Sequence, residues 1–130
     1  MTHDALAASG RGVSGRPAID RAVLGEWLDG DDDAINALLV LFCESICAEA
    51  ASMHELLAQD ELVQFAHAAH RLRGAALSMG ARALADFAGL LFTAALAKDR
   101  NACVEGIPML ATLVRLVEAE VPASAASGGI

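Results

Sequence analysis

The segment from Asp60 to Gly80, DELVQFAHAAHRLRGAALSMG, has the three-to-four-residue spacing of an amphipathic helix. On a helical wheel, one stripe is apolar and contains Leu62, Phe65, Ala66, Ala69, Leu72, Ala76 and Met79. A second stripe, of polar or very small residues, contains His67, His70, Gly74 and Ser78. The segment is therefore predicted to be a helix that buries one face and carries His70 near the middle of another.

Segments on both sides of it share this periodicity and are joined by short loops. A short helix is expected over Ile19–Leu28, which Asp29-Gly30 ends, and long helices are expected over 31–58, 60–79, 81–97 and 101–120. The acidic run Asp31–Asp33 suits the positive N-terminal end of a helix better than a metal-binding loop. Pro108 falls inside the last segment, where we expect a kink or a restart with Pro108 in a first turn.

Four long helices with short loops predict an all-α fold. The expected architecture is an antiparallel up-down-up-down four-helix bundle with a short additional N-terminal helix. The composition agrees, because the chain is 55% hydrophobic but only 4% aromatic and is rich in alanine. We expect the bundle to span residues 18–121, with flexible tails at 1–17 and 122–130.

The composition also excludes several classes of protein. A net charge of -8 argues against nucleic acid and anionic membranes as partners. Three cysteines do not make a disulfide scaffold, so a reducing, cytoplasmic location is expected. We see no secretory signal and no apolar run long enough to span a membrane. The sequence lacks a phosphate-binding loop, CxxC, HExxH and a nucleophile elbow, so it does not predict an ATP-dependent kinase.

Two features single out the surroundings of His70. Glycine in a helix interior costs about 0.5–1 kcal/mol relative to alanine, so Gly74, one turn after His70, needs a reason. Either the absent side chain gives a large group access to the imidazole, or it permits close helix packing. In addition, residues 62–85 contain Arg71, Arg73 and Arg82 and no acidic residue, which suits a site that must carry a phosphoryl group. On the wheel Arg73 lies near the apolar stripe, so its side chain must reach across toward His70.

The stretch AHRLRGAALSMGARAL, from Ala69 to Leu84, resembles the signature of histidine-containing phosphotransfer (HPt) domains. The positions in register are Ala69, His70, Leu72, Gly74, Ala75, Gly80, Ala81 and Leu84. The similarity extends over roughly residues 19–120, through the short first helix and the acidic turn before the second.

This resemblance implies a phosphocarrier without kinase activity. It would relay a phosphoryl group between receiver-domain aspartates of a hybrid histidine kinase and a response regulator. His70 corresponds to the phosphorylated nucleophile, Arg73 to the family's lysine and Gly74 to its glycine, with Arg71 as a second candidate for the phosphoryl oxygens. The receiver would supply Mg²⁺, so the chain itself is expected to need no cofactor or metal, and a monomer is expected.

The resemblance also suggests where a receiver docks. The first helix would contribute an apolar patch, with further contacts from the histidine helix. The expected docking residues are Ile19, Val23, Leu24, Trp27, His67, Ala75 and Ser78.

Two departures and two alternatives remain. Arg73 replaces the usual lysine, and Leu91-Phe92 stands where the family often has Leu-Glu. Phe92 either adds to the core, which we expect, or forms an exposed contact with a partner. One alternative is a degenerate bundle that binds and sequesters a receiver or kinase without phosphotransfer. The other is a metal-binding bundle that uses the pairs Cys43/Cys47 and His67/His70. We expect the cysteines to pack as small hydrophobic residues among their Leu and Ile neighbours instead.

Overall fold

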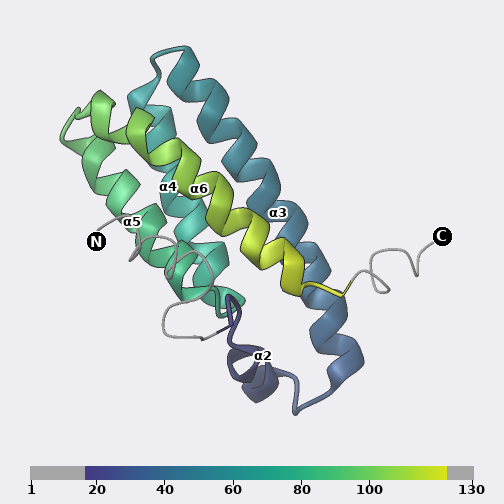
Figure 1. Cartoon of the computed structure of the whole chain (residues 1–130). Coiled ribbons are helices and arrows are strands. Elements are labelled where there is room, and N and C mark those ends of the chain that lie inside the picture. Colours follow the sequence, from purple (N-terminus) through teal and green to yellow (C-terminus); the bar gives the residue numbers. More distant parts are fainter. Residues whose placement is uncertain (1–16, 123–130) are drawn as a thin grey trace, which may run out of the picture.

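The computed structural model describes residues 17–122, which form helices and no strand. The helices are α2 (Arg21–Trp27), α3 (Asp32–Ala58), α4 (Leu62–Ser78), α5 (Arg82–Leu96) and α6 (Arg100–Glu120). Each long helix packs against two others: α4 lies between α3 and α5, and α6 lies between α5 and α3 (Figure 1). The predicted antiparallel bundle with a short N-terminal helix is confirmed. The two predicted tails fall outside the described residues, apart from Pro17 and Pro122.

The three loops between the long helices have the same local structure. Each has three residues, and the middle residue, Asp60, Gly80 or Lys98, has a positive φ of 62°, 78° or 60°. In each loop the last residue donates its backbone N–H to a carbonyl five residues earlier, as Ala81 does to Ala76 at 2.8 Å. This is the hydrogen bond of a Schellman motif, which ends a helix sharply and returns the chain antiparallel.

The acidic run before α3 starts this helix, as predicted. Asp31 is the N-cap, and its side chain accepts a hydrogen bond from the backbone N–H of Ala34 at 3.2 Å. Asp32 and Asp33 lie in the first turn, where their negative charges face the positive end of the helix dipole.

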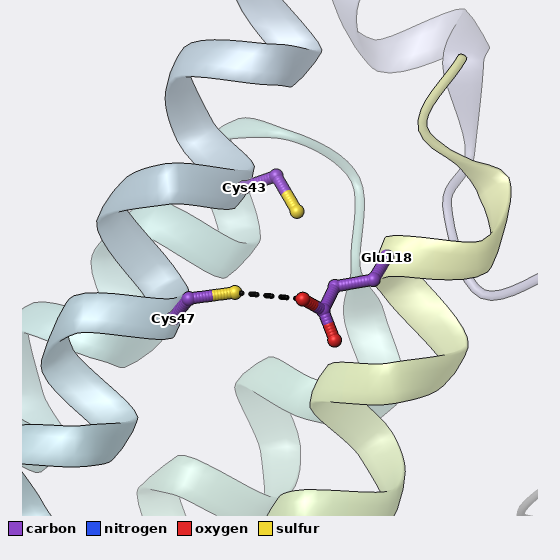
Figure 2. A group of neighbouring side chains, drawn as sticks. All are labelled: Cys43, Cys47 and Glu118. Carbon is purple, nitrogen blue, oxygen red and sulfur yellow. Dashed lines mark hydrogen bonds between the residues drawn. The ribbon is translucent and has the colours of Figure 1, made fainter. Parts of the chain in front are cut away.

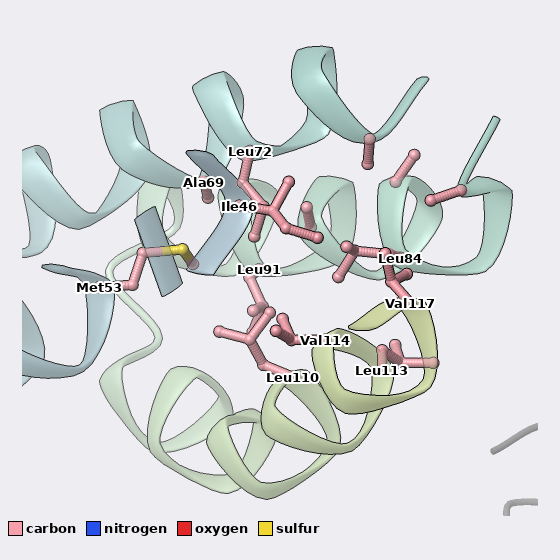
Figure 3. Packing of buried hydrophobic residues seen from close by; sticks show 14 of the residues in the cluster. Ile46, Met53, Ala69, Leu72, Leu84, Leu91, Leu110, Leu113, Val114 and Val117 are labelled. Atoms are coloured by element: carbon pink, nitrogen blue, oxygen red, sulfur yellow. The ribbon is translucent and has the colours of Figure 1, made fainter. Parts of the chain in front are cut away.

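The core is a single cluster of aliphatic side chains and alanines (Figure 3). Phe65 is its one fully buried aromatic residue among the described residues. Between α4 and α5 the core consists largely of alanine, with Ala69, Ala76, Ala85 and Ala88 all inaccessible to solvent. Small side chains at a helix contact allow the two helix axes to approach closely.

The segment before α2 is bound to two distant parts of the chain. The backbone N–H of Asp20 donates to the carbonyl of Gly80 at 2.8 Å. The carboxylate of Glu120, at the end of α6, accepts the backbone N–H groups of Ala18 and Ile19. Gly80 is required here, because it has a positive φ and a Cβ at this position would collide with the backbone oxygen of Asp20.

The prediction of a restart at Pro108 was wrong. α6 is one helix from Arg100 to Glu120, and Pro108 lies in its third turn, not its first. Pro108 is exposed, whereas Gly106 and Leu110 on either side of it are buried. Packing of both halves against the core therefore holds the helix together although proline cannot donate a backbone hydrogen bond.

By length and composition α3 could cross a membrane, contrary to the sequence-based expectation that no segment could. A core helix of a bundle can pass the same test. In the structure α3 packs into the bundle through its buried residues Ile35, Leu39, Ile46, Met53 and Leu57.

Candidate functional site

His70 lies near the middle of α4 on the exposed side of this helix. The predicted division of α4 into two faces holds, because Phe65, Ala69, Leu72 and Ala76 are buried, whereas His67, His70, Gly74 and Ser78 are all exposed. Ala68, which the wheel did not assign to the apolar stripe, is also buried. The buried face fixes the helix in the bundle and thereby presents the imidazole of His70 to solvent.

Phe92 on α5 packs against the His70 ring. The ring centroids are 5.3 Å apart and the planes are tilted by 52°. Phe92 is half-buried and also contacts the core, so the expectation of a core residue describes only part of its environment. A tilted aromatic pair at this distance is favourable and restricts the orientations of the imidazole.

Gly74 leaves open space one turn after His70. A Cβ built at Gly74 meets no atom within 4 Å other than its own helix and neighbours, so close helix packing does not explain this glycine. Of the two reasons that the sequence left open, the structure removes close packing, and access to the imidazole remains as the hypothesis. Nearby, the Ser78 hydroxyl donates to the Gly74 carbonyl at 3.0 Å, which directs the serine back onto its own helix.

Arg73 extends across the seam between α4 and α5. Its Cδ and Nε lie 3.4 Å from where a Cβ of Gly89 would be, so the side chain rests on the bare backbone of α5. Gly89 precedes Phe92 by one turn, which places Arg73 on the same seam as His70. The guanidinium is exposed and has no acidic partner among residues 17–122.

Arg71 is directed elsewhere. Its guanidinium donates two hydrogen bonds to the carboxylate of Glu49 on α3, at 2.9 and 3.3 Å. The hydrogen bonds and the charge of Glu49 raise the pKa of Arg71. The structure therefore does not bring Arg71 to His70, and its predicted contact with phosphoryl oxygens has no support in this geometry.

The predicted docking residues divide into exposed and buried ones. Trp27 is 78% exposed, and His67 and Ser78 are exposed as well, while Val23 and Ala75 are half-buried. Ile19 and Leu24 are only 2% exposed. Their assignment to a docking patch was wrong, because both side chains pack into the core and hold α2 against the bundle.

The metal alternative that combined two histidines with two cysteines is not supported. Within residues 17–122, the potential ligand group around Cys43 and Cys47 is completed by Glu118 and not by a histidine. His67 and His70 lie on the α4 surface, away from that group.

Sequence reasoning missed the contacts that α5 makes with the site. Ala81 lies in the loop between α4 and α5, and His70 and Phe92 are equally far from it in sequence. Arg73 and Gly89 form a second pair that is equidistant from Ala81, closer to the loop. In an antiparallel helix pair, residues equidistant from the connecting loop lie side by side. This spacing was the signal that could have identified Phe92 and Gly89 as neighbours of His70 and Arg73.

Comparison with known proteins identifies the family. The family model of the Hpt domain matches residues 37–123, about two thirds of the chain. No curated protein and no solved structure matches the chain. The matched region contains the helices α4 and α5 that carry His70, Arg73, Gly74 and Phe92. The chain therefore belongs to the Hpt domain family, whose members are phosphocarriers of two-component phosphorelays.

Proposed function

We propose that this chain relays a phosphoryl group between receiver-domain aspartates through His70. One observation carries the proposal: the exposed imidazole of His70 stands beside open space at Gly74, on a helix that the core holds in place. The partners would be the receiver domains of a hybrid histidine kinase and of a response regulator, and the reaction would take place in the cytoplasm.

From this chain the transfer requires an accessible and correctly oriented ring nitrogen, together with positive charge for the phosphoryl oxygens. A nitrogen of the neutral imidazole attacks the phosphorus of a receiver's aspartyl phosphate. The new P–N bond forms as the P–O bond to the aspartate breaks, and the aspartate leaves as a carboxylate. The reverse sequence, on the second receiver, returns the phosphoryl group to oxygen. Such an in-line displacement depends on positioning and charge neutralisation, with a divalent cation supplied by the receiver.

The residues around His70 have distinct roles in this proposal. Phe92 limits rotation of the imidazole, and the open space at Gly74 admits the phosphoryl group and the receiver loops. Arg73 has no acidic partner within residues 17–122, so its guanidinium is available for the phosphoryl oxygens. Arg71 is left out, because Glu49 already binds its guanidinium.

Docking would use the exposed part of the predicted patch. Trp27 on α2 offers a large exposed aromatic surface, and His67 and Ser78 flank His70 on α4. Aromatic residues are frequent anchors of protein interfaces. Ile19 and Leu24 would act only indirectly, by holding α2 in position.

A two-receiver relay tests the proposal. A donor receiver carrying radiolabelled aspartyl phosphate is mixed with the chain and then with an acceptor receiver, and label is followed on all three proteins. We expect wild-type chain to carry label transiently and pass it on, and the His70→Gln variant to do neither while it still binds the receivers. Tight binding of a receiver without labelling of the wild-type chain would contradict the relay and favour the sequestering alternative. Labelling with ATP alone would contradict the absence of kinase activity.

A further inference from the structure

Two cysteines and a glutamate converge on the side of the bundle formed by α3 and α6. Cys43 and Cys47 lie one turn apart on α3, and both sulfurs point toward the carboxylate of Glu118 on α6 (Figure 2). The thiol of Cys47 donates to this carboxylate at 3.3 Å. One ligand atom of each residue lies within 4.8 Å of the other two.

Cys47 packs against the hydrophobic core, as the sequence suggested, but its thiol also donates a hydrogen bond to Glu118. Cys43 and Cys47 are half-buried, whereas Cys103, elsewhere in the bundle, is fully buried. The charged groups that act on the two thiols are Glu118 on α6 and Glu44 on α3, and both are acidic. The group of three side chains therefore has donor atoms and excess negative charge, but no positive charge of its own.

We propose that Cys43, Cys47 and Glu118 form a binding site for a thiophilic divalent cation of the Zn²⁺ class. Thiolate sulfur and carboxylate oxygen are both ordinary zinc ligands, and a tetrahedral site places neighbouring ligand atoms about 3.5–3.8 Å apart. The three ligand atoms, within 4.8 Å of one another, differ from those separations by about an ångström at most. Rotation of the exposed Glu118 side chain and of the two cysteine side chains can close this difference. Water would take the fourth position, on the solvent side of Glu118.

Binding must displace protons. Burial, followed by the hydrogen bond to Glu118, raises the pKa of the Cys47 thiol to about 12, and burial also raises the pKa of Cys43. A cysteine binds such a cation as the thiolate, so each thiol gives its proton to solvent when its sulfur binds. Release of two protons predicts that the affinity rises with pH.

The site is separate from the proposed phosphotransfer site. His70 and Phe92 lie on the seam between α4 and α5, whereas this cluster joins α3 to α6 on the other side of the bundle. A bound cation would link two helices that are distant in sequence and would stabilise the folded chain by binding only to it. The proposal does not depend on phosphotransfer, so either can fail without the other.

The test is metal titration of the full, reduced chain. Cd²⁺ reports thiolate ligands through near-ultraviolet charge-transfer absorbance, and Zn²⁺ affinity is measured by competition with a chromogenic chelator at several pH values. We expect one ion per chain, release of two protons and a higher Tm with Zn²⁺. Loss of a residue that only hydrogen-bonds a metal ligand lowers metal affinity about 10–100-fold. Cys43→Ser and Cys47→Ser each remove a ligand itself, so each should lower the affinity more than about 100-fold. Glu118→Gln should lower the affinity by a smaller factor of about ten, because the amide oxygen of glutamine can still occupy the ligand position weakly, and the charge-transfer band should remain.

Three control variants make the assignment specific. Glu105→Gln changes an exposed carboxylate on the same helix, Cys103→Ala removes the thiol outside the cluster, and His67→Gln removes a histidine of the α4 surface; all three should leave the affinity unchanged. Circular dichroism verifies the fold of each variant. Binding that survives loss of both Cys43 and Cys47, or that is lost in His67→Gln, would overturn the proposal. Failure of wild-type chain to bind Zn²⁺ or Cd²⁺ at pH 8 would overturn it as well.

Discussion

The ring of Phe92 on α5 lies against the imidazole of His70 on α4, with centroids 5.3 Å apart. The candidate nucleophile is therefore positioned from a second helix and not from its own helix alone. Because Phe92 also contacts the core, packing in the interior is connected to the orientation of an exposed side chain. This contact gives Phe92 a positioning role in the proposed reaction.

Replacement of Phe92 should separate positioning from stability. Phe92→Leu keeps most of the apolar contact with the core but removes the aromatic pair, so we expect slower phosphoryl transfer with little change in unfolding free energy. Phe92→Ala should in addition lower the unfolding free energy by about 1–2 kcal/mol, less than the 3–5 kcal/mol for a fully buried phenylalanine. The NMR shifts of the His70 ring protons provide a direct readout, since they lose the ring-current effect in both variants. Unchanged His70 shifts in Phe92→Leu would show that the two rings do not meet in solution.

Substitutions at Gly74 should change stability and transfer in opposite directions. Gly74→Ala meets no neighbouring atom, so it should raise the unfolding free energy by about 0.5–1 kcal/mol through helix propensity. Gly74→Leu should remain folded but slow transfer to His70 strongly, because its side chain fills the open space. Ala119→Leu is the matched control, since it adds a leucine to an exposed position of α6, which packs against α3 and α5. Equal transfer rates in Gly74→Leu and Ala119→Leu would contradict the access role of the glycine.

The two arginines flanking Leu72 should behave differently. Arg73→Ala should slow transfer and shorten the lifetime of the phosphorylated chain, and Arg73→Lys should restore part of the rate by returning a positive charge. Arg71→Ala should leave transfer unchanged and lower the unfolding free energy by at most about 1 kcal/mol, as expected for a largely exposed ion pair. Transfer kinetics and urea denaturation check both effects. A larger loss of transfer in Arg71→Ala than in Arg73→Ala would reverse the assignment.

Alanine substitutions at Gly80 and Gly30 test whether the backbone of Asp20 rests on Gly80. Both glycines have a positive φ, 78° and 74°, but only Gly80 has a backbone oxygen where its Cβ would be. Gly30→Ala should lower the unfolding free energy by about 1–2 kcal/mol, the cost of a left-handed conformation for a residue with a Cβ. Gly80→Ala should cost clearly more, because the segment containing Asp20 must also move. Equal losses in urea denaturation would mean that this segment does not rest on Gly80.

Much of the fold could be predicted from the sequence, because helix periodicity and cap residues are local signals. The buried face of α4, the cap at Asp31 and the short loops all follow from such signals. Pro108 could not be placed correctly, because the local cost of a proline does not reveal that Gly106 and Leu110 pack into the core on either side of it. For the same reason Ile19 and Leu24 were misassigned, since an apolar pattern on a short helix does not distinguish a core contact from a docking contact.

The site was predictable in part. The spacing of His70, Gly74 and Gly80 identified the helix and the family resemblance, which the family model confirms. The partners of the side chains were not evident, since Glu49, Phe92 and Glu118 approach from other helices at large separations in sequence. Only the register of the bundle shows that Arg71 is bound, that Arg73 is available and that two cysteines face a carboxylate.

Locating the phosphoryl group on the chain tests the central claim most directly. Wild-type chain and the His70→Gln variant are incubated with a radiolabelled, phosphorylated receiver, and the stability of the label to acid and base is measured. The account predicts acid-labile, base-stable label on the wild-type chain, mapped to His70, and no label on His70→Gln. Label on both proteins would contradict the assignment to His70 and would direct attention to the neighbouring His67.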